Sequence, residues 1–338
     1  MDLRAALEAA LAAAPAAELA IAVEGLITRY RASVPAGRDQ AILARPVDVL
    51  AYAAYRMPAT HAAVRSALVQ AAQAMPTFAP ASLLDLGGGT GAAAWAATEV
   101  FPGLARVTVL DQVPEALKLG QGLGVGRPAL RQAQWRTEAL PPQGALPAAD
   151  LITISYVLNE LSSSDQAALL DAAAAATGGA VAVVEPGTPA GYGRVLAART
   201  ALLARGFRVV APCPHQATCP LAEPDWCHFS VRINRSALHR RVKGAQLGYE
   251  DEKFAYVLAV RDRPAGLRLE QPPGAPAARV LRHPVTRKGL VRLRLCAHSG
   301  VVTDETVSKR QGDRYRAARD LVWGDPWSLP EGHSLPGS

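Results

Sequence analysis

Cysteine is scarce in this sequence, with 4 among 338 residues, and a secretory signal is missing. The first residues, Met1-Asp2-Leu3-Arg4, do not form the basic start of a signal peptide, and Glu8 and Glu18 interrupt the alanine-rich run that follows. We therefore expect reduced thiols rather than a disulfide framework, and a cytoplasmic, bacterial location.

Long apolar runs are also absent, although 50% of the residues are hydrophobic. No uninterrupted stretch approaches the roughly 20 residues of a membrane-spanning helix, so no membrane partner is expected. At 338 residues, the chain exceeds what one hydrophobic core usually serves. The sequence therefore predicts one large domain with appendages, or two domains.

Positive charge is concentrated in the last third of the chain. Residues 231–319 contain 20 Lys or Arg and 8 Asp or Glu, a balance of +12, whereas the whole chain has a net charge of +7. Such asymmetry is typical of a polyanionic partner, with nucleic acid first, and the alternative is a solvated basic surface.

The order of helical and extended patterns predicts an α/β fold. Residues 2–30 and 46–75 have mostly helical periodicity. Short apolar runs then alternate with helical stretches, which indicates a doubly wound parallel sheet. The expected strands are 80–86, 106–110, 150–155, 180–185 and 207–211, and the expected helices between them are 92–100, 164–177 and 191–205.

A glycine-rich turn follows the first expected strand in Asp85-Leu86-Gly87-Gly88-Gly89-Thr90-Gly91. Glycines let the backbone approach a ligand closely, and Asp111 ends the second strand, where a carboxylate can accept both ribose hydroxyls. An Asp before the glycines resembles motif I of class I S-adenosylmethionine-dependent methyltransferases. The alternatives are a nicotinamide enzyme and a turn without ligand. The predicted cofactor residues are Asp85, Gly87, Gly88, Gly89, Gly91 and Asp111.

Three of the four cysteines lie close together, at Cys213, Cys219 and Cys227, and the fourth, Cys296, lies far downstream. Structural zinc sites favour shorter paired spacings, so this spacing suits an iron–sulfur cluster at least as well as zinc. Unliganded buried cysteines are the third alternative. His215 and His228 are possible substitute ligands, or else polar loop residues.

The residues that would contact a methyl acceptor are harder to identify from the sequence. Methyl transfer needs mainly alignment of a nucleophile with the methyl group, so few residues are obligatory. Residues 155–161 stand where amino-methylating enzymes carry an Asp/Asn-Pro-Pro-aromatic motif, which is absent here. Tyr156, Asn159 and Glu160 are the candidate catalytic residues; alternatively, Tyr156 packs on the helix and Glu160 caps it.

The sequence resembles the methyltransferase-like family of small-ribosomal-subunit assembly proteins over nearly its whole length. The matching stretches are Tyr55-Arg-Met-Pro-Ala-Thr-His61, 84–91, Glu185-Pro-Gly-Thr188, Cys213 to Phe229, Arg241-Val-Lys-Gly244 and Trp323-Gly-Asp325. The resemblance implies a class I methyltransferase fold, S-adenosylmethionine as cofactor, and the small subunit and its rRNA as partners. It also implies a [4Fe–4S] cluster held by Cys213, Cys219, Cys227 and Cys296.

The C-terminal third contains the expected RNA contacts. Alternation in the strand 290–296 places Arg292, Arg294 and Cys296 on one face. This would leave a buried ligand on a polar face unless Cys296 lies at the strand end or beyond a bulge. A helix is expected over 308–323, less clearly before Gly312, and guanidiniums suit backbone phosphates. The candidate RNA-binding residues, expected to be exposed, are Lys309, Arg310, Arg314, Arg316 and Arg319.

Three parts are expected: a helical region 1–78, a methyltransferase-like domain 79–265 with a cysteine loop 212–228, and a basic, β-rich extension 277–325. Pro272-Pro-Gly-Ala-Pro276 is the expected linker. The leading function is a ribosome-assembly factor that binds rRNA and is monomeric off the ribosome. The alternatives are an active rRNA methyltransferase and a redox-sensing RNA-binding module with a vestigial cofactor pocket.

Overall fold

The computed structural model describes residues 2–31, 45–221, 223–237, 239–240, 247–261 and 278–328. The stretch Arg241-Val242-Lys243-Gly244 and the expected linker 272–276 lie outside these residues. In the described part, no single helix is long and apolar enough to cross a membrane, and one helix pair, at the N-terminus, reaches that length only across a bend of 116°.

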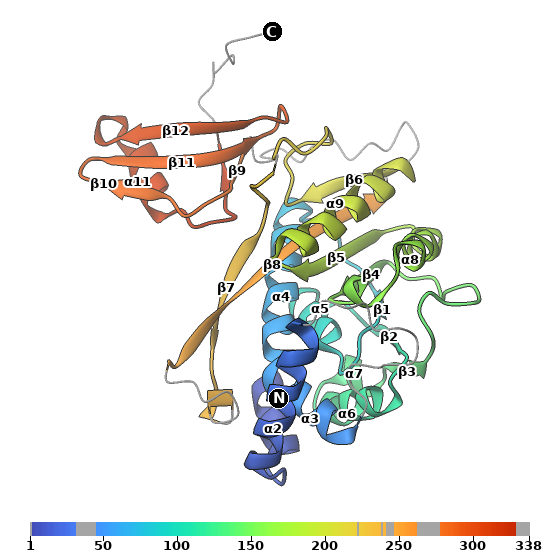
Figure 1. Cartoon of the computed structure of the whole chain (residues 1–338). Coiled ribbons are helices and arrows are strands. Elements are labelled where there is room, and N and C mark those ends of the chain that lie inside the picture. The colour runs from blue at the N-terminus through green and yellow to red at the C-terminus, as the bar shows by residue number, and fades with distance from the viewer. Residues whose placement is uncertain are drawn as a thin grey trace.

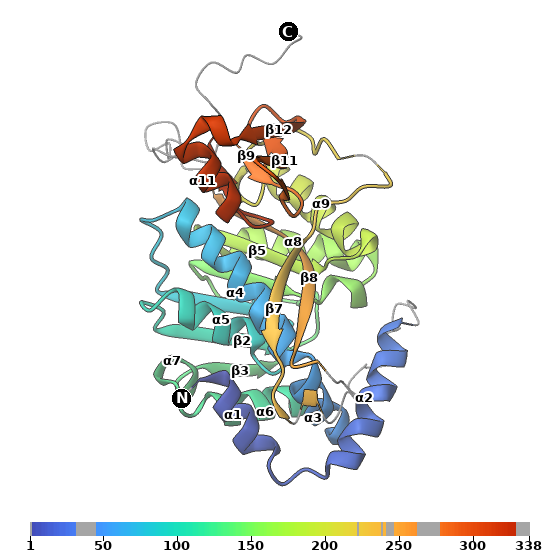
Figure 2. The same cartoon turned by 90° about the vertical axis from the view of Figure 1, so that its left-hand side faces the viewer.

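Four helices form the N-terminal region (Figures 1 and 2). Helix α1 begins after Asp2, whose carboxylate accepts a hydrogen bond from the amide of Ala5. Proline in the first turn of α3 and of α4 suits positions whose amides have no partner within the helix. The bounds are α1 Leu3–Leu11, α2 Ala16–Arg31, α3 Pro46–Tyr55 and α4 Met57–Ala74.

The central sheet has the strand order β3-β2-β1-β4-β5-β8-β6, with β7 paired to β8. Strands β1 to β5 are parallel, and β8 runs antiparallel to both β5 and β6. The strands are β1 Ser82–Leu86, β2 Arg106–Asp111, β3 Gln134–Thr137, β4 Leu151–Ser155, β5 Ala180–Pro186, β6 Phe207–Ala211, β7 Phe229–Asn234 and β8 Tyr249–Arg261.

Helices cover both faces of this sheet, so its central strands are buried on both sides. Every residue of β1 and β4 is buried, which explains why the sequence shows continuous apolar runs there rather than alternation. Helices α4 and α5 share one core with the sheet, and α8 and α9 share the other. The remaining bounds are α5 Ala92–Val100, α6 Pro114–Gly124, α7 Pro128–Arg131, α8 Ser163–Ala176 and α9 Pro189–Ala204.

This doubly wound sheet confirms the predicted class I methyltransferase (Rossmann-like) fold. The parallel strands end at one edge, and a ligand is expected there, where the strand order reverses around β1 and β4. Strands β7 and β8, which form a long antiparallel hairpin, were not predicted from the sequence. Its outer half, Tyr249 to Phe254 paired with β7, extends past the sheet alongside α4 (Figures 1 and 2).

The C-terminal part is a second, five-stranded sheet with a small core of its own. Its order is β10-β11-β9-β13, with β12 paired to β11, and Figure 1 shows it beside the upper end of β7 and β8. The elements are β9 Ala278–Val280, β10 Val285–Arg287, β11 Leu290–Ala297, β12 Val302–Ser308, the 3-10 helix η2 Lys309–Gln311, α11 Asp313–Asp320 and β13 Pro326–Trp327.

Two expectations for this part change. The helix expected over 308–323 is shorter, because Gly312 has a φ of 54° and separates η2 from α11. Along β11, alternation holds from Val291 to Leu295, but Cys296 is buried together with Ala297 at the strand end. Cys296 is therefore not solvated like Arg292 and Arg294, because the end of β11 packs against the cysteine loop.

Candidate functional site

The glycine turn lies between the carboxyl end of β1 and the start of α5. A Cβ at Gly88 would lie 2.5 Å from Oδ2 of Asp85 and from Cγ1 of Val109, so only glycine fits there. Gly91 has a φ of 84°, and a Cβ there would lie 2.6 Å from the Trp135 ring. The turn thus keeps its backbone open to a ligand beside the free amides at the start of α5.

Asp85 is fully buried beneath this turn. Its Oδ1 accepts a hydrogen bond of 2.7 Å from the Thr153 hydroxyl, whereas its Oδ2 has no partner among the described residues. Burial raises the pKa of Asp85 to about 7, the Thr153 hydrogen bond opposes the shift, and the nearby Asp111 adds to it. The amide of Ala94, in the first turn of α5, also opposes the shift. An unsatisfied buried carboxylate oxygen is costly, and a donor on a bound ligand would satisfy it.

Asp111 ends β2 and faces the same turn. It accepts hydrogen bonds from the amides of Gly89, at 2.8 Å, and Val113, at 2.9 Å. Burial raises its pKa, and these amides oppose the shift. Asp111 therefore fixes the glycine turn and keeps lone pairs for a diol, as a ribose-binding carboxylate requires.

The three candidate catalytic residues follow β4. Tyr156 has a φ of 59°, and Asn159 and Glu160 belong to the 3-10 helix η1 Leu158–Glu160. Oδ1 of Asn159 is buried without a hydrogen-bond partner among the described residues. Burial raises the pKa of Glu160 to about 8, with Asp111 and Glu185 adding to the shift. Ser162, not Glu160, caps α8, since its hydroxyl accepts from the amide of Asp165.

Two charged residues that the sequence reading did not assign occupy the acceptor side. The Tyr156 hydroxyl donates to Oε1 of Glu252 at 2.9 Å. Arg56, between α3 and α4, binds both oxygens of Glu252, at 3.2 and 2.9 Å, and lies over the Tyr156 ring. Tyr156, one of the side chains expected to contact a methyl acceptor, is therefore already hydrogen-bonded to Glu252. Arg56 lies in the stretch 55–61 that carried the family resemblance; Glu252 has no signal in the sequence.

The four cysteines line one pocket between α9, β6, β8 and the C-terminal sheet. Cys213 and Cys219 belong to the loop after β6, Cys227 precedes β7, and Cys296 lies on β11. Burial raises the pKa of Cys213 and Cys227, and it raises that of Cys296 to about 12. Neighbouring thiols add to each shift, because their thiolates would repel one another.

Hydrogen bonds from outside the cysteine set reach two of the sulfurs. The Tyr192 hydroxyl donates to Sγ of Cys219 at 3.1 Å, and Nε2 of His215 lies 3.3 Å from Sγ of Cys296. His228 instead stacks on Trp226 and lies against Trp323. Both histidines lie in loops and are buried. In the described part of the chain, no three His, Cys, Asp or Glu side chains are already arranged around a metal position.

The candidate RNA-binding residues divide into two groups. Lys309, Arg310, Arg316 and Arg319 are exposed. Arg314 is not: it binds Glu305 at 2.7 Å, donates to the carbonyl of Ser328 and covers the Trp327 ring, so the expectation of an exposed Arg314 is wrong. Arg316 is exposed but paired with Asp313.

Further basic residues gather at one end of the C-terminal sheet. Arg287, the last residue of β10, and Lys288, in the turn between β10 and β11, are exposed. The amide of Lys309 donates to the carbonyl of Gly289 at 2.8 Å, which brings Lys309 and Arg310 to that turn. We call Arg287, Lys288, Lys309 and Arg310 the basic end of the sheet.

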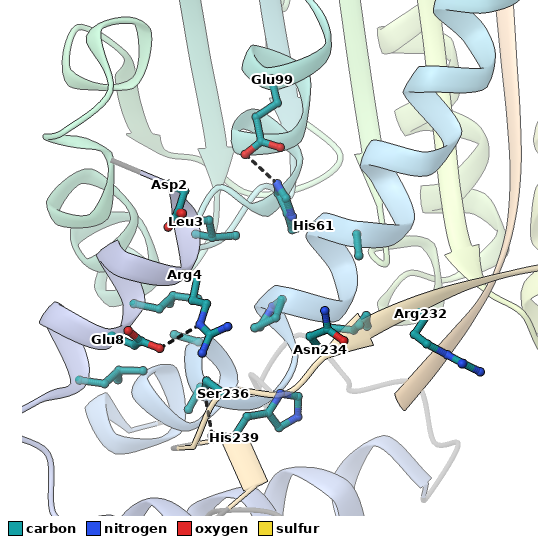
Figure 3. Close-up of a pocket in the computed structure, with 17 residues that line it drawn as sticks. Asp2, Leu3, Arg4, Glu8, His61, Glu99, Arg232, Asn234, Ser236 and His239 are labelled. Carbon is teal, nitrogen blue, oxygen red and sulfur yellow. Dashed lines mark hydrogen bonds and ion pairs between the residues drawn. The ribbon is translucent and has the colours of Figure 1, made fainter. Parts of the chain in front are cut away.

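A separate cavity of about 330 Å³ lies between α1, the α3–α4 junction and the end of β7 (Figure 3). Leu3, Leu7 and Leu11 of α1 form its apolar wall, and His61 lies 3.2 Å from Glu99 on the opposite side. It contains none of the predicted cofactor, metal or RNA-binding residues.

Comparisons with known proteins give matches over most of the chain. The family model described as "Mitochondrial small ribosomal subunit Rsm22" matches residues 46–328. The human "Ribosome assembly protein METTL17, mitochondrial" is 29% identical over 299 residues, which cover 82% of this chain and 61% of that protein. "Rsm22-cox11 tandem protein 2, mitochondrial" from Schizosaccharomyces pombe is 24% identical over 325 residues, covering 83% of this chain and 43% of that protein. The chain thus spans less than two thirds of the length of either relative.

Among solved structures, magnesium protoporphyrin IX methyltransferase from Synechocystis PCC 6803 with bound SAH is 14% identical. The match covers 70% of this chain and 94% of that one, with a TM-score of 0.40.

The expected cytoplasmic, bacterial location is wrong, because the matching family and both relatives are named as mitochondrial. That expectation was drawn from reduced thiols and from first residues that do not resemble a secretory signal. Neither property distinguishes the cytosol from the interior of a mitochondrion.

Proposed function

Because the chain belongs to the family described as mitochondrial small ribosomal subunit Rsm22, we propose that it acts in assembly of the small ribosomal subunit. The observation that carries the proposal is the extent of the match, since residues 46–328 include the cofactor domain, the cysteine pocket and the basic sheet. One relative is itself named as a ribosome assembly protein.

We propose small-subunit rRNA as the partner of the C-terminal sheet. Its basic end presents four exposed cations, and Arg292 adds another on the outer face of β11. Salt bridges neutralise Arg294, Arg314 and Arg316, so these three are poorer phosphate ligands. Phosphate contacts of this kind position a protein on RNA without reading its sequence.

S-adenosylmethionine is the proposed ligand of the glycine turn. Asp111 would accept hydrogen bonds from the ribose hydroxyls, and the glycine turn would pass close to the cofactor. The unpaired oxygen of Asp85 would accept a hydrogen bond from the amino group of the methionine part. When bound, the cofactor would supply an electrophilic methyl group. Burial raises the pKa of Asp85, Asp111 and Glu160 and so disfavours their charged forms, and a bound sulfonium cation would oppose this shift.

The cysteine pocket fits a [4Fe–4S] cluster by the chemistry of its donors. In the described part of the chain, four thiols and no carboxylate line it, and thiolate is the usual ligand of iron–sulfur clusters. Cys213, Cys219, Cys227 and Cys296 would hold the cluster. Because Cys296 comes from β11, the ligand set would tie the C-terminal sheet to the central domain.

Active methyl transfer to rRNA is the second candidate, and the acceptor side favours a binding role over it. The Tyr156 hydroxyl is held by Glu252, and Glu252 by Arg56, so an acceptor would have to displace a buried ion pair. Glu160 and Asn159 are the residues left to receive a proton or orient an acceptor. A redox-sensing RNA-binding module would retain the cluster and the basic end but bind no cofactor.

Two measurements on the full chain test these assignments. Anaerobically purified protein should contain about four iron and about four sulfide ions per chain. Stoichiometric zinc without sulfide would contradict the cluster. Calorimetry should show that S-adenosylmethionine binds. Binding of a nicotinamide dinucleotide without binding of S-adenosylmethionine would contradict the proposed cofactor. Transfer of labelled methyl groups to immature small subunits would favour the second candidate.

A further inference from the structure

Two arginines are buried in the wall of the cysteine pocket. Arg199 of α9 is 4% exposed and Arg279 of β9 is 3% exposed. Both are permanently charged, since arginine does not lose its proton in proteins. Burying such a charge without an opposite charge is expensive.

Neither arginine has a carboxylate partner in the part of the chain that the structure describes. Arg199 donates to the carbonyls of His215, at 3.1 Å, and Ala217, at 2.7 Å. Its Nε has no hydrogen-bond partner among the described residues. These carbonyls belong to the loop that carries Cys213 and Cys219, so the guanidinium both shapes that loop and brings a positive charge to it.

Arg279 is held in the same way from a different direction. It donates to the carbonyl of Pro212 at 2.9 Å, to the side-chain oxygen of Gln70 at 2.6 Å and to the carbonyl of Gly324 at 2.8 Å. All three acceptors are neutral. Another arginine near the thiols, Arg282, is already paired with Asp225.

Among the described residues, the pocket lining therefore contains two buried positive charges and no Asp or Glu side chain. Within that lining, the groups able to become anions are the four cysteines and the hydroxyls of Tyr192 and Tyr256. With the thiols protonated, the arginines have no counter-charge. Four thiolates around a [4Fe–4S]²⁺ core carry a double negative charge, which two guanidiniums balance.

We propose that Arg199 and Arg279 are the counter-ions of a doubly negative four-thiolate centre in this pocket, and that they set its reduction potential. The inference depends on the proposed cluster. Reduction transfers one electron from the reductant to the core and makes the centre triply negative, with no bond broken. Nearby positive charge stabilises this more negative state, so removing either arginine lowers the potential.

The test uses the full-length protein with cluster, comparing Arg199→Gln with Arg199→Lys, and Arg279→Gln with Arg279→Lys, in a dithionite titration followed by electron paramagnetic resonance. Each Gln variant should shift the one-electron reduction equilibrium at least tenfold toward the oxidised cluster, about 59 mV. The Lys variants, which keep the charge, should shift it less. Gln variants should also lose iron faster to a chelator.

A second measurement separates charge from structure. After the cluster is removed, Arg199→Gln should melt no lower than Arg199→Lys, because it no longer buries an uncompensated charge; with the cluster present, the order should reverse. An Arg199→Gln protein that folds only without cluster supports the proposal. Equal potentials and an unchanged melting order for Gln and Lys variants would overturn it, as would failure of both Arg199 variants to fold. Wild-type protein without iron or sulfide would instead overturn the proposed cluster.

Discussion

Nη2 of Arg56 lies 2.9 Å from Oε1 of Glu252, so the junction of α3 and α4 is joined to β8 across 196 positions of sequence. Both side chains are largely buried, with 21% and 13% of their surfaces exposed. Tyr156 completes the set through its hydroxyl. The N-terminal helices are thereby fixed over the side of the sheet where a methyl acceptor would enter.

Arg56→Ala should destabilise the protein strongly, because it leaves the carboxylate of Glu252 buried without its partner. Breaking a buried ion pair in this way typically costs about 3–5 kcal/mol. Urea unfolding measures the change. The control is Arg232→Ala, which removes an ion pair with Asp251 in which both side chains are exposed, and its effect should be much smaller. Equal destabilisation by the two variants would contradict the role given to Arg56.

Gly88→Ala should weaken S-adenosylmethionine binding while leaving the fold intact. The added Cβ would push against the Asp85 carboxylate and Val109 at 2.5 Å, so the turn could not keep its present path. We expect at least a tenfold loss of affinity, which is about 1.4 kcal/mol. Gly122→Ala is the control, since a Cβ there meets nothing within 4 Å. Unchanged affinity for Gly88→Ala would place the ligand elsewhere.

Glu160→Gln should flatten the pH dependence of stability in the cofactor-free protein. Burial raises the pKa of Glu160 from its ordinary value of 4.5 to about 8. Between these values, the folded chain keeps a proton that the unfolded chain releases, so stability falls as pH rises, by up to about 1.4 kcal/mol per pH unit. Above the folded pKa, this contribution is lost. Urea unfolding at pH 5.5 and pH 8 should show a smaller difference for the variant; identical differences would refute the shift.

Changing Lys288, Lys309 and Arg310 together to Ala should weaken rRNA binding and reduce its salt dependence. Each phosphate contact contributes about 0.7 to 0.9 to the slope of log affinity against log salt concentration, so the slope should become shallower by about two to three. The control replaces Arg4, Arg65 and Arg136, which are at least half exposed but belong to other surfaces. If the control flattens the slope equally, the basic end is only a solvated surface.

The sequence predicted five strands of the central sheet, β1, β2, β4, β5 and β6. Strands β1, β4 and β5 are almost wholly buried and are therefore uninterrupted apolar runs in the sequence. Strands β3, β7 and β8 were not predicted; β3 is short and largely exposed, so it lacks such a run. The glycine turn and Asp111 were predicted from residue types at a fixed distance from a strand. The structure brings them together, since Asp111 accepts a hydrogen bond from the amide of Gly89, and their ligand stays a proposal. The resemblance to small-subunit proteins is confirmed at the level of the family. It depended on short stretches such as 55–61, and the structure now gives Arg56 in that stretch a partner.

Other features depend on contacts between distant segments, which a local pattern does not contain. Alternation placed Cys296 on the polar face, but the end of β11 is covered by the cysteine loop. Arg314 looked exposed by helical periodicity, yet Glu305 and Trp327 on neighbouring strands enclose it. Glu252 and Arg279 carried no signal, since an acidic or basic residue in a strand is usually solvated and only the fold buries these two.

Ultraviolet cross-linking of the tagged full chain in its native compartment, followed by sequencing of the bound RNA and mapping of the cross-linked peptides, tests the central claim most directly. We predict enrichment of small-subunit rRNA over large-subunit rRNA, with cross-links in the peptides that contain Lys288 and Lys309. Equal recovery of both rRNAs, or cross-links confined to other parts of the chain, would contradict a small-subunit assembly factor that binds through its C-terminal sheet.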